Sequence, residues 1–190
     1  MVEGDAGEAG DLDTADDGIT TETFTVVVDP VNDLPTLDEL VDPTPILEDG
    51  QVQQVNLLGV TAGGGEDQDL TLTVASDDLS LITTPALSYT SANTDGYVFY
   101  IPVADQSGAA DVTVTVTDTG LDEQAGTSDD GVFSRMFTVN ITPVNDLPTL
   151  DAISDPAAVP EDSGQQSIAL AGIDAGGGET QALAVTAAAA

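Results

Sequence analysis

The sequence has 190 residues, of which 35 are Asp or Glu and only one is Lys or Arg, so its formal net charge is −34 at pH 7. Nucleic acids and anionic membrane surfaces are therefore excluded as partners, because binding them requires clusters of Lys and Arg that displace counterions. His and Cys are absent, which removes zinc and copper sites, disulfide bonds and the nucleophile–base pairs of most enzymes.

The remaining composition favours a folded chain without a membrane span. Apolar residues make up 41% of the sequence, which suffices for a packed core and is too high for a disordered acidic tail. No run approaches the roughly 20 apolar residues of a membrane helix, so we expect no direct membrane insertion. Glu3, Asp5 and Glu8 interrupt the first residues, which do not resemble a signal peptide. We expect any export signal to lie outside these residues.

An internal repeat organises the chain. The segment Pro-Val-Asn-Asp-Leu-Pro-Thr occurs at residues 30–36 and again at 143–149, an offset of 113 residues, and the same offset relates 62–66 to 175–179. We therefore predict that residues 1–33 are the C-terminal part of a preceding repeat and that 34–146 are a complete β-sandwich repeat. Residues 147–190 are expected to be the N-terminal part of a following repeat, which is truncated.

Within the complete repeat, apolar residues alternate with Thr, as in residues 111–117, which indicates strands with one core face and one threonine face. Gly, Asp, Ser and Pro separate these segments, and no helical period of useful length is present. The predicted strands, in chain order, are 45–47, 52–58, 70–75, 86–90, 97–103, 112–117 and 132–141. Seven short strands with regular turn signals predict an all-β fold, an antiparallel sandwich.

Acidic residues gather in the connections between these strands, whereas the outward strand positions carry mainly Thr. Strand alternation assigns the loops after the second, fourth and sixth strands to the end of the sandwich that holds Asn32 and Asp33, which we call the first junction. The other loops belong to the end that holds Asn145 and Asp146, the second junction. Acids of one repeat, the linker and the next repeat should therefore converge at each junction.

Such convergence predicts a metal ion. Crowded carboxylates repel one another and raise one another's pKa, and Arg135 is the only basic side chain that could neutralise them. Calcium accepts about six to eight oxygen ligands in flexible geometry, whereas magnesium requires an octahedron. The candidate Ca²⁺ ligands are Asn32, Asp33, Glu48, Asp49, Glu66, Asp67, Asp69, Asp105, Asp118, Asn145, Asp146 and Glu179.

Several short motifs together carry a family resemblance. They are Val-Asn-Asp-Leu-Pro at 31–35 and 144–148, Glu-Asp-Gly-Gln at 48–51, Ala-Gly-Gly-Gly-Glu at 62–66, and Pro-Val-Ala-Asp-Gln-Ser-Gly at 102–108. The combination resembles the cadherin-like, Ig-like tandem repeats of very large bacterial surface proteins and adhesins.

This resemblance implies an Ig-like or cadherin-like sandwich at the cell surface, acting as a calcium-stiffened spacer in cell adhesion. The partners that it implies are the neighbouring repeats of the same chain. Glu48 and Asp105 then correspond to acidic positions of the animal cadherin repeat, and Asn145-Asp146 match its linker, although Pro143 replaces the first linker Asp.

Two further segments of the sequence were considered as metal-binding motifs. Residues 11–22 have acids at the first, third and seventh positions of an EF-hand loop, but Ala15 stands at the fifth and Asp16 stands where the turn requires Gly, so an EF-hand is disfavoured. The acid-rich hairpin loop to which this segment belongs recurs at residues 118–130. That loop either holds an ion by itself or is simply solvated.

Two functional alternatives also remain. If Val98 and Tyr100 point inward, Tyr97, Phe99 and Ile101 form an exposed apolar patch, and the repeat itself could bind a like repeat or a glycan. A halophile's acidic surface domain without a specific ion site is the second alternative; it would be expected to carry acids on its strands as well. We expect no catalytic residues and no enzyme activity.

Overall fold

The computed structural model describes residues 2–4 and 19–188. The chain divides into two compact units, Met1–Val31 and Asn32–Ala190. In the first unit, β1 (Val2–Gly4) pairs antiparallel with β2 (Ile19–Thr21). Residues 11–18 of the segment considered above as an EF-hand lie outside the described residues. How the chain is partitioned into repeats stays a prediction.

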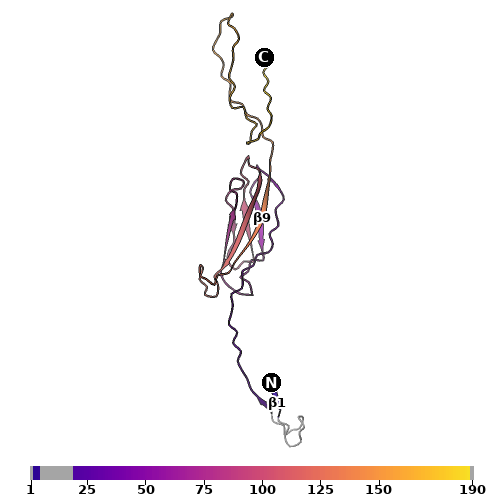
Figure 1. Ribbon diagram of the computed structural model, residues 1–190, viewed down its shortest axis with the longest axis vertical. Helices are drawn as coiled ribbons and strands as arrows, with labels where there is room; N and C mark the ends of the chain where they lie inside the picture. The colour runs from indigo at the N-terminus through magenta and orange to yellow at the C-terminus, as the bar shows by residue number, and fades with distance from the viewer. Residues whose placement is uncertain (1, 5–18, 189–190) are drawn as a thin grey trace. The chain divides into compact units, whose positions relative to one another are not determined.

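The second unit contains a seven-stranded sandwich. Its strands are β3 (Ile46–Leu47), β4 (Gln53–Leu58), β5 (Leu70–Ser76), β6 (Ala86–Ser88), β7 (Asp95–Tyr100), β8 (Gly108–Asp118) and β9 (Val132–Thr142). One sheet has the order β3-β9-β8-β5 and the other β4-β7-β6, and the two sheets lie face to face (Figure 1). The predicted all-β, Ig-like sandwich is confirmed, with every predicted strand present.

Most strand ends lie within two residues of the predicted ones; the larger differences are the end of β7, the start of β8 and the pairing of β3. β7 ends at Tyr100 rather than Val103, because Pro102 has no N–H for a continuing ladder and forms only an isolated bridge to Ile82. β8 begins at Gly108, where small residues without strand patterning pair with the end of β9. β3 pairs in parallel with β9, while the other strand pairs in the described residues are antiparallel.

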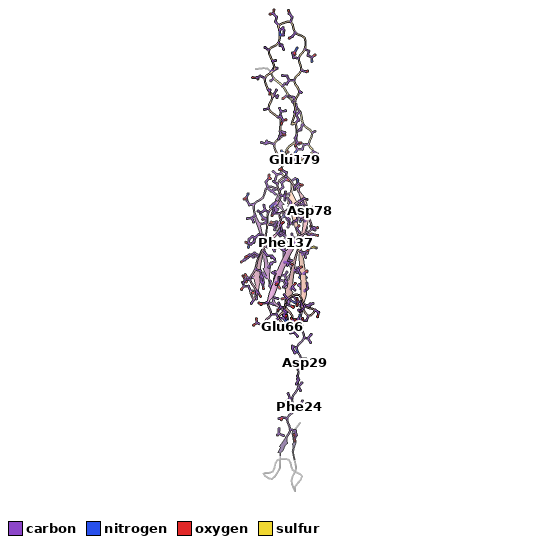
Figure 2. All side chains as sticks on the ribbon, turned by 90° about the vertical axis from the view of Figure 1, so that its left-hand side faces the viewer. Phe24, Asp29, Glu66, Asp78, Phe137 and Glu179 are labelled. Atoms are coloured by element: carbon purple, nitrogen blue, oxygen red, sulfur yellow. The ribbon has the colours of Figure 1, made fainter. Side chains whose placement is uncertain are left out.

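The core lies between the two sheets and follows the predicted alternation. Val112, Val114 and Val116 of β8 are fully buried, and the threonines between them face outward and remain partly exposed. Phe137 of β9 packs against Tyr100 of β7, with ring centroids 6.4 Å apart. Figure 2 shows Phe137 in the middle of the sandwich. The valine–threonine alternation thus builds one apolar sheet face and one polar face.

The outer face of the three-stranded sheet carries the apolar patch considered above. Val98 and Tyr100 are 0% and 1% exposed, so they point into the core. Tyr97 and Ile101 are exposed, and Phe99 is half-buried with its ring centroid 6.2 Å from that of Tyr97. The side-chain orientations on which the adhesive alternative depends are therefore present.

The described part of the chain contains no helix with the length and apolar character needed to cross a membrane.

Candidate metal centre

The two junctions share one local architecture, repeated at the 113-residue offset. At the first junction, the Asp33 N–H donates to Glu66 Oε2 at 3.2 Å; at the second, the Asp146 N–H donates to Glu179 Oε2 at 3.3 Å. The turns that present the two glutamates are closed by equivalent backbone hydrogen bonds, Glu66 N to Gly63 O and Glu179 N to Gly176 O. The linker aspartate and the loop glutamate are therefore fixed together in both places.

The triple-glycine turn makes this approach possible. Gly64 and Gly177 both have φ of +49°, in the left-handed region where residues with a Cβ are strained. A Cβ at Gly64 would collide with Asp33 Oδ2, and a Cβ at Gly177 would collide with Asp146 Oδ2. Glycine is thus required in each turn so that the backbone can lie against the linker carboxylate.

An amide pair also recurs at the two junctions and was not predicted. Gln68 Nε2 donates to Asn32 Oδ1 at 2.6 Å, and Gln181 Nε2 donates to Asn145 Oδ1 at 2.8 Å. Gln181 Nε2 also lies 2.6 Å from Glu179 Oε2. The signal was available in the sequence, because Gln68 and Gln181 are related by the same offset as the linkers.

The second junction collects acids from three separate segments. Glu48 follows β3 and is only 3% exposed; its Oε1 accepts a hydrogen bond from Val144 N at 2.6 Å, and its own N–H donates to Thr142 O. Asp105 lies in the β7–β8 loop with a left-handed φ of 58°, and the position of a Cβ on Gly177 would be 3.3 Å from its Oδ1. Glu48 therefore holds the linker against the end of the sandwich, and Asp105 faces the loop that carries Glu179.

Asp146 is the central carboxylate of this group. Its Oδ2 is buried and has no hydrogen-bond partner. Burial of the carboxylate raises the pKa of Asp146, and the negative charges of Asp105, Asp49, Glu179 and Glu48, in that order, raise it further. An unpartnered carboxylate oxygen among four other acids is unfavourable when the group is charged, and a bound cation would relieve the repulsion.

A polar cavity of about 500 Å³ adjoins Asp146 and is open to solvent. It is lined by Glu48, Asp105, Gln106, Ser107, Pro143, Gly177, Gly178, Glu179, Thr180 and Gln181. Six of the twelve predicted ligands, namely Glu48, Asp49, Asp105, Asn145, Asp146 and Glu179, are thus brought to one place. Figure 2 shows Glu179 near one end of the sandwich and Glu66 near the other.

The pKa shift of Asp146 predicts a pH dependence in the presence of chelator. A carboxyl whose pKa is raised by folding stabilises the fold when protonated, fully below its ordinary value of 3.8, and this contribution is lost as pH rises through the raised value. In metal-free protein at neutral pH, Asp146→Asn should therefore increase the free energy of unfolding. Urea denaturation at pH 7 and below pH 3.8 checks this, because the difference should vanish at the lower pH; an unchanged difference would contradict it.

Beyond the shared turn and amide pair, the first junction has different contacts from the second. Asn32 Nδ2 donates to Asp129 O at 2.9 Å and lies 3.3 Å from Asp118 Oδ1. Asp118 is 1% exposed, and its Oδ1 accepts hydrogen bonds from Gly120 N at 2.9 Å and Gly131 N at 2.7 Å. Asp118 thus closes the β8–β9 loop at its base, a role that depends on burial and could not be read from the sequence.

The other acids predicted at this end are more dispersed. Asp69 Oδ1 accepts a hydrogen bond from Ser91 Oγ at 3.1 Å, on the loop between β6 and β7. Asp67 is exposed beside a small hollow that it shares with Glu66. The structure places neither carboxylate in a hydrogen bond with Asn32 or Asp33. The second junction is therefore the better candidate for an ion.

The β8–β9 loop holds a compact acidic triad. Asp122, Asp129 and Asp130 present carboxylate oxygens within 4.8 Å of one another, the one such group among the described residues. Two of these carboxylates already accept hydrogen bonds from backbone N–H groups. Asp129 Oδ2 accepts from Leu121 N and Asp122 N, and Asp130 Oδ2 accepts from Gly126 N. Hydrogen bonds from Thr127 and the backbone lower the pKa of Asp129. These oxygens are close enough together to hold a metal ion, so the loop either binds one or is stabilised by these hydrogen bonds alone.

No protein-family model matches the sequence, and a comparison with curated proteins finds no match. Domains 4 and 5 of the S-layer protein SbsC are similar over 67% of this chain, with 16% identity and a TM-score of 0.36. SbsC domains 1–6 are similar over 83% of it, with 14% identity and a TM-score of 0.38. The PapD-like domain 7 of human CEP192 is similar over 65%, with 9% identity and a TM-score of 0.39.

The chain spans 59% of the two-domain SbsC structure, 19% of the six-domain one and 96% of the CEP192 domain. Because the TM-scores are below 0.4, these similarities give no evidence about fold or function beyond the strand topology itself. Any function must therefore be argued from the site.

Proposed function

We propose that this chain is a calcium-stiffened repeat module of a bacterial surface adhesin, acting as an extracellular spacer whose junction binds Ca²⁺. The observation that carries the proposal is the Asp146 carboxylate, with a buried, unpartnered Oδ2 and four further acids near it. The repeat motifs of the sequence support the same assignment. The partners would be the neighbouring repeats of the same chain.

The donor set fits calcium. Asp146, Asp105 and Glu179 offer carboxylate oxygens, and Asp49 and Glu48 lie close enough to act on the charge of Asp146. The backbone carbonyls of Leu147 and Asp105 also lie beside the glycine turn. Calcium takes about six to eight such hard oxygen ligands and tolerates irregular geometry, whereas the smaller magnesium ion does not. With no His or Cys in the chain, softer metals have no advantage.

Calcium at this place would act mechanically. The ligands come from the end of one sandwich, from the linker, and from the first loop of the following segment, so a bound ion would join three pieces of chain. Without a cation, five acids repel one another there. The linker should therefore be stiff with calcium and flexible in chelator, which is the property a spacer needs.

Isothermal titration calorimetry with calcium tests this proposal. The wild-type chain should bind calcium at the second junction, and Asp146→Asn should lose that site. Asp33→Asn is a matched control, since Asp33 has the same turn, glutamate and amide partners, whereas of the two aspartates only Asp146 has a buried oxygen without a hydrogen-bond partner. Equal binding by all three proteins would refute a specific site.

An adhesive function is the second candidate, favoured by the patch of Tyr97, Phe99 and Ile101. Its occupant would be a like repeat or a glycan on another cell. Beads coated with the protein should then cluster, and Tyr97→Ser/Phe99→Ser should abolish the clustering, because it removes both aromatic rings of the patch. Clustering that survives this double substitution would exclude the patch as an adhesive face.

A further inference from the structure

β5 has an open outer edge and is the longest of the outer strands of the sandwich. It ends its sheet, so β8 pairs with it on one side only. β3 and β6 have two and three residues, and β4 accepts a hydrogen bond from Asp38 N at Leu58 O. Beyond the short β3, Thr138 N of β9 donates to Asp42 Oδ1 at 2.7 Å. β5, with seven residues, therefore offers the longest edge for a further strand.

The pairing of β5 with β8 shows which backbone groups lie on this edge. Asp77 N donates to Asp111 O, in the register that continues the β5–β8 ladder. Along an antiparallel strand, the N–H and C=O groups of successive residues point to alternate sides. The even-numbered residues of β5 therefore point their backbone groups outward, and Leu70 N, which donates to Ser91 Oγ at 2.9 Å, agrees with this. The N–H and C=O groups of Leu72 and Val74 are left as a template for an added strand.

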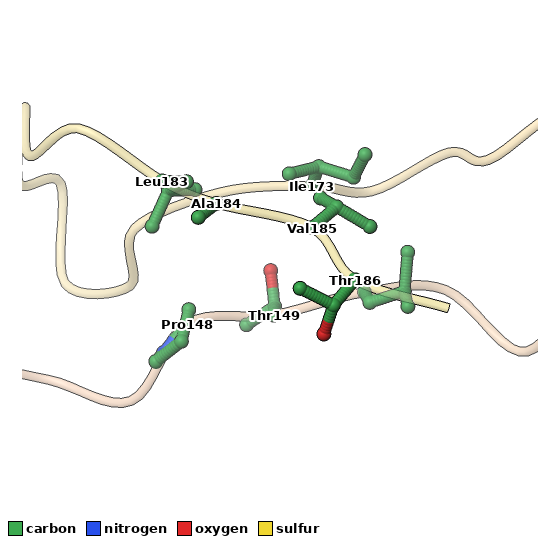
Figure 3. Close-up of a pocket in the computed structure, with 8 residues that line it drawn as sticks. Pro148, Thr149, Ile173, Leu183, Ala184, Val185 and Thr186 are labelled. Atoms are coloured by element: carbon green, nitrogen blue, oxygen red, sulfur yellow. The ribbon is translucent and has the colours of Figure 1, made fainter. Parts of the chain in front are cut away.

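β5 lacks the residues that usually protect an open edge. Its sequence, Leu-Thr-Leu-Thr-Val-Ala-Ser, contains no charge, Gly or Pro, whereas natural edge strands commonly carry Lys, Pro or a bulge against unwanted pairing. An uncharged segment recurs at the 113-residue offset, where Leu183 and Val185 correspond to Leu70 and Leu72. Figure 3 shows Leu183 and Val185 beside the segment of Ile173. The absence of charge is thus common to both copies of this segment.

Acidic residues stand at the two ends of β5. Asp69 precedes the strand and Asp77 follows it; both are exposed, and they lie about 27 Å apart along the strand. Each uses only Oδ1 in a hydrogen bond among the described residues, Asp69 with Ser91 Oγ and Asp77 with Asp111 N. In an added antiparallel strand, the residues opposite these two would have Cβ atoms about 4.5–5.5 Å away. Opposite charges at both positions would favour pairing, and like charges would oppose it.

A second copy of this chain does not fit the edge of β5. In a symmetric antiparallel β5–β5 pair centred on Thr73, Asp69 of each copy would lie opposite Asp77 of the other, and each copy has a net charge of −34. Arg135 is the one basic residue, so no segment of this chain offers a cation at both positions. The complementary occupant is therefore a basic segment of another protein.

We propose that the open edge of β5 binds an extended segment of another protein by antiparallel strand addition, and that this segment carries Lys or Arg opposite Asp69 and Asp77. The backbone groups of Leu72 and Val74 supply the main-chain hydrogen bonds. The two flanking acids supply specificity, because they attract a basic strand and repel an acidic one. Ala182 takes the place of Asp69 at the offset, so this specificity belongs to the complete repeat.

Fluorescence anisotropy with labelled peptides tests the proposal on the whole chain. The probe is Lys-Thr-Thr-Val-Thr-Val-Thr-Thr-Lys, with its lysines opposite Asp69 and Asp77. N-methylation of its fourth and sixth residues, which face Val74 and Leu72, should abolish binding because it removes N–H groups that pair with β5. N-methylation of the third and seventh residues, whose N–H groups point away, should leave binding unchanged. All three peptides have the same charge, so equal binding by all three would mean charge attraction alone and would overturn the proposal.

Variants of β5 test the protein side of the same contact. Val74→Pro removes an outward N–H, which edge strands tolerate, and should abolish binding; Val74→Ala truncates the side chain but keeps the N–H and should bind like the wild type. Circular dichroism checks that both variants keep the sandwich. Asp69→Asn/Asp77→Asn should weaken binding about tenfold, because two exposed ion pairs are lost. Binding that survives Val74→Pro, or that is lost in Val74→Ala, contradicts strand addition.

The measurements are made in chelator, so that no ion at the second junction contributes. Asp146→Asn should bind the probe like the wild type, and a failure of the calcium proposal would leave this result unchanged. Light scattering checks the remaining occupant. A wild type that dimerises while Val74→Pro stays monomeric would assign the edge to a second copy of the chain and overturn the proposal of a basic partner.

Discussion

Calcium should raise the unfolding midpoint of this protein by about 10 °C over the chelated protein. An ion at about 100 times its Kd adds about 2.7 kcal/mol to the free energy of unfolding, and a domain of this size gains about 4 °C or more per kcal/mol. The gain arises because calcium replaces repulsion among Asp146, Asp105, Asp49 and Glu179 by attraction to one cation.

Differential scanning calorimetry at constant ionic strength makes the measurement, with calcium, magnesium or sodium salts replacing one another. Magnesium should give a much smaller rise, because the irregular set of oxygens does not offer an octahedron. Asp146→Asn should lose the calcium-specific part, whereas Asp33→Asn should keep it. Equal stabilisation by all three salts would mean that the acids form only a solvated coat, and the halophile alternative would then replace the spacer.

Leu57→Ala should lower the free energy of unfolding by about 3–5 kcal/mol. Leu57 of β4 is 0% exposed and belongs to the core between the sheets. Truncation removes its contacts and leaves a cavity that the two sheets cannot close. A loss of this size is a large fraction of the total stability of a domain.

Leu170→Ala is the matched control. Leu170 is the counterpart of Leu57 at the 113-residue offset and is 40% exposed. Its truncation should change the free energy of unfolding by about 0.5 kcal/mol or less. Urea denaturation of both variants, in dilute protein so that association is absent, makes the comparison. Equal losses would contradict the assignment of the core to the complete repeat.

The strands were predictable because one signal dominated them. Alternation of Val with Thr over residues 112–117 places every second side chain in the core, and no helical arrangement would bury the same set. The parallel pairing of β3 with β9 was not predictable, since it depends on which edge the first strand meets after a polar connection. The start of β8 at Gly108 was also not predicted, because Gly108 and Ala109 do not take part in an alternation of apolar and polar residues.

Part of the candidate metal site could likewise be predicted from the sequence, and part could not. Strand alternation was enough to bring Glu48, Asp105 and Asp146 to one end, because loops after odd-numbered strands share an end of an antiparallel sandwich. The burial of Glu48 and the hydrogen bonds to Asp118 could not be predicted from the sequence, because both depend on backbone N–H groups of distant segments. Gln68 and Gln181 could have been predicted as a recurring pair, because they are related by the 113-residue offset.

The parallel pairing of β3 with β9 determines how the repeat would resist a pulling force. The chain enters the sandwich through the segment that leads to β3 and leaves it directly after β9, so tension along the chain draws these two strands past each other in opposite directions. The Ile46–Ile141 pairing, the bond from Glu48 N to Thr142 O and that from Val144 N to Glu48 Oε1 are then loaded together in shear. They would have to break at once rather than open one after another.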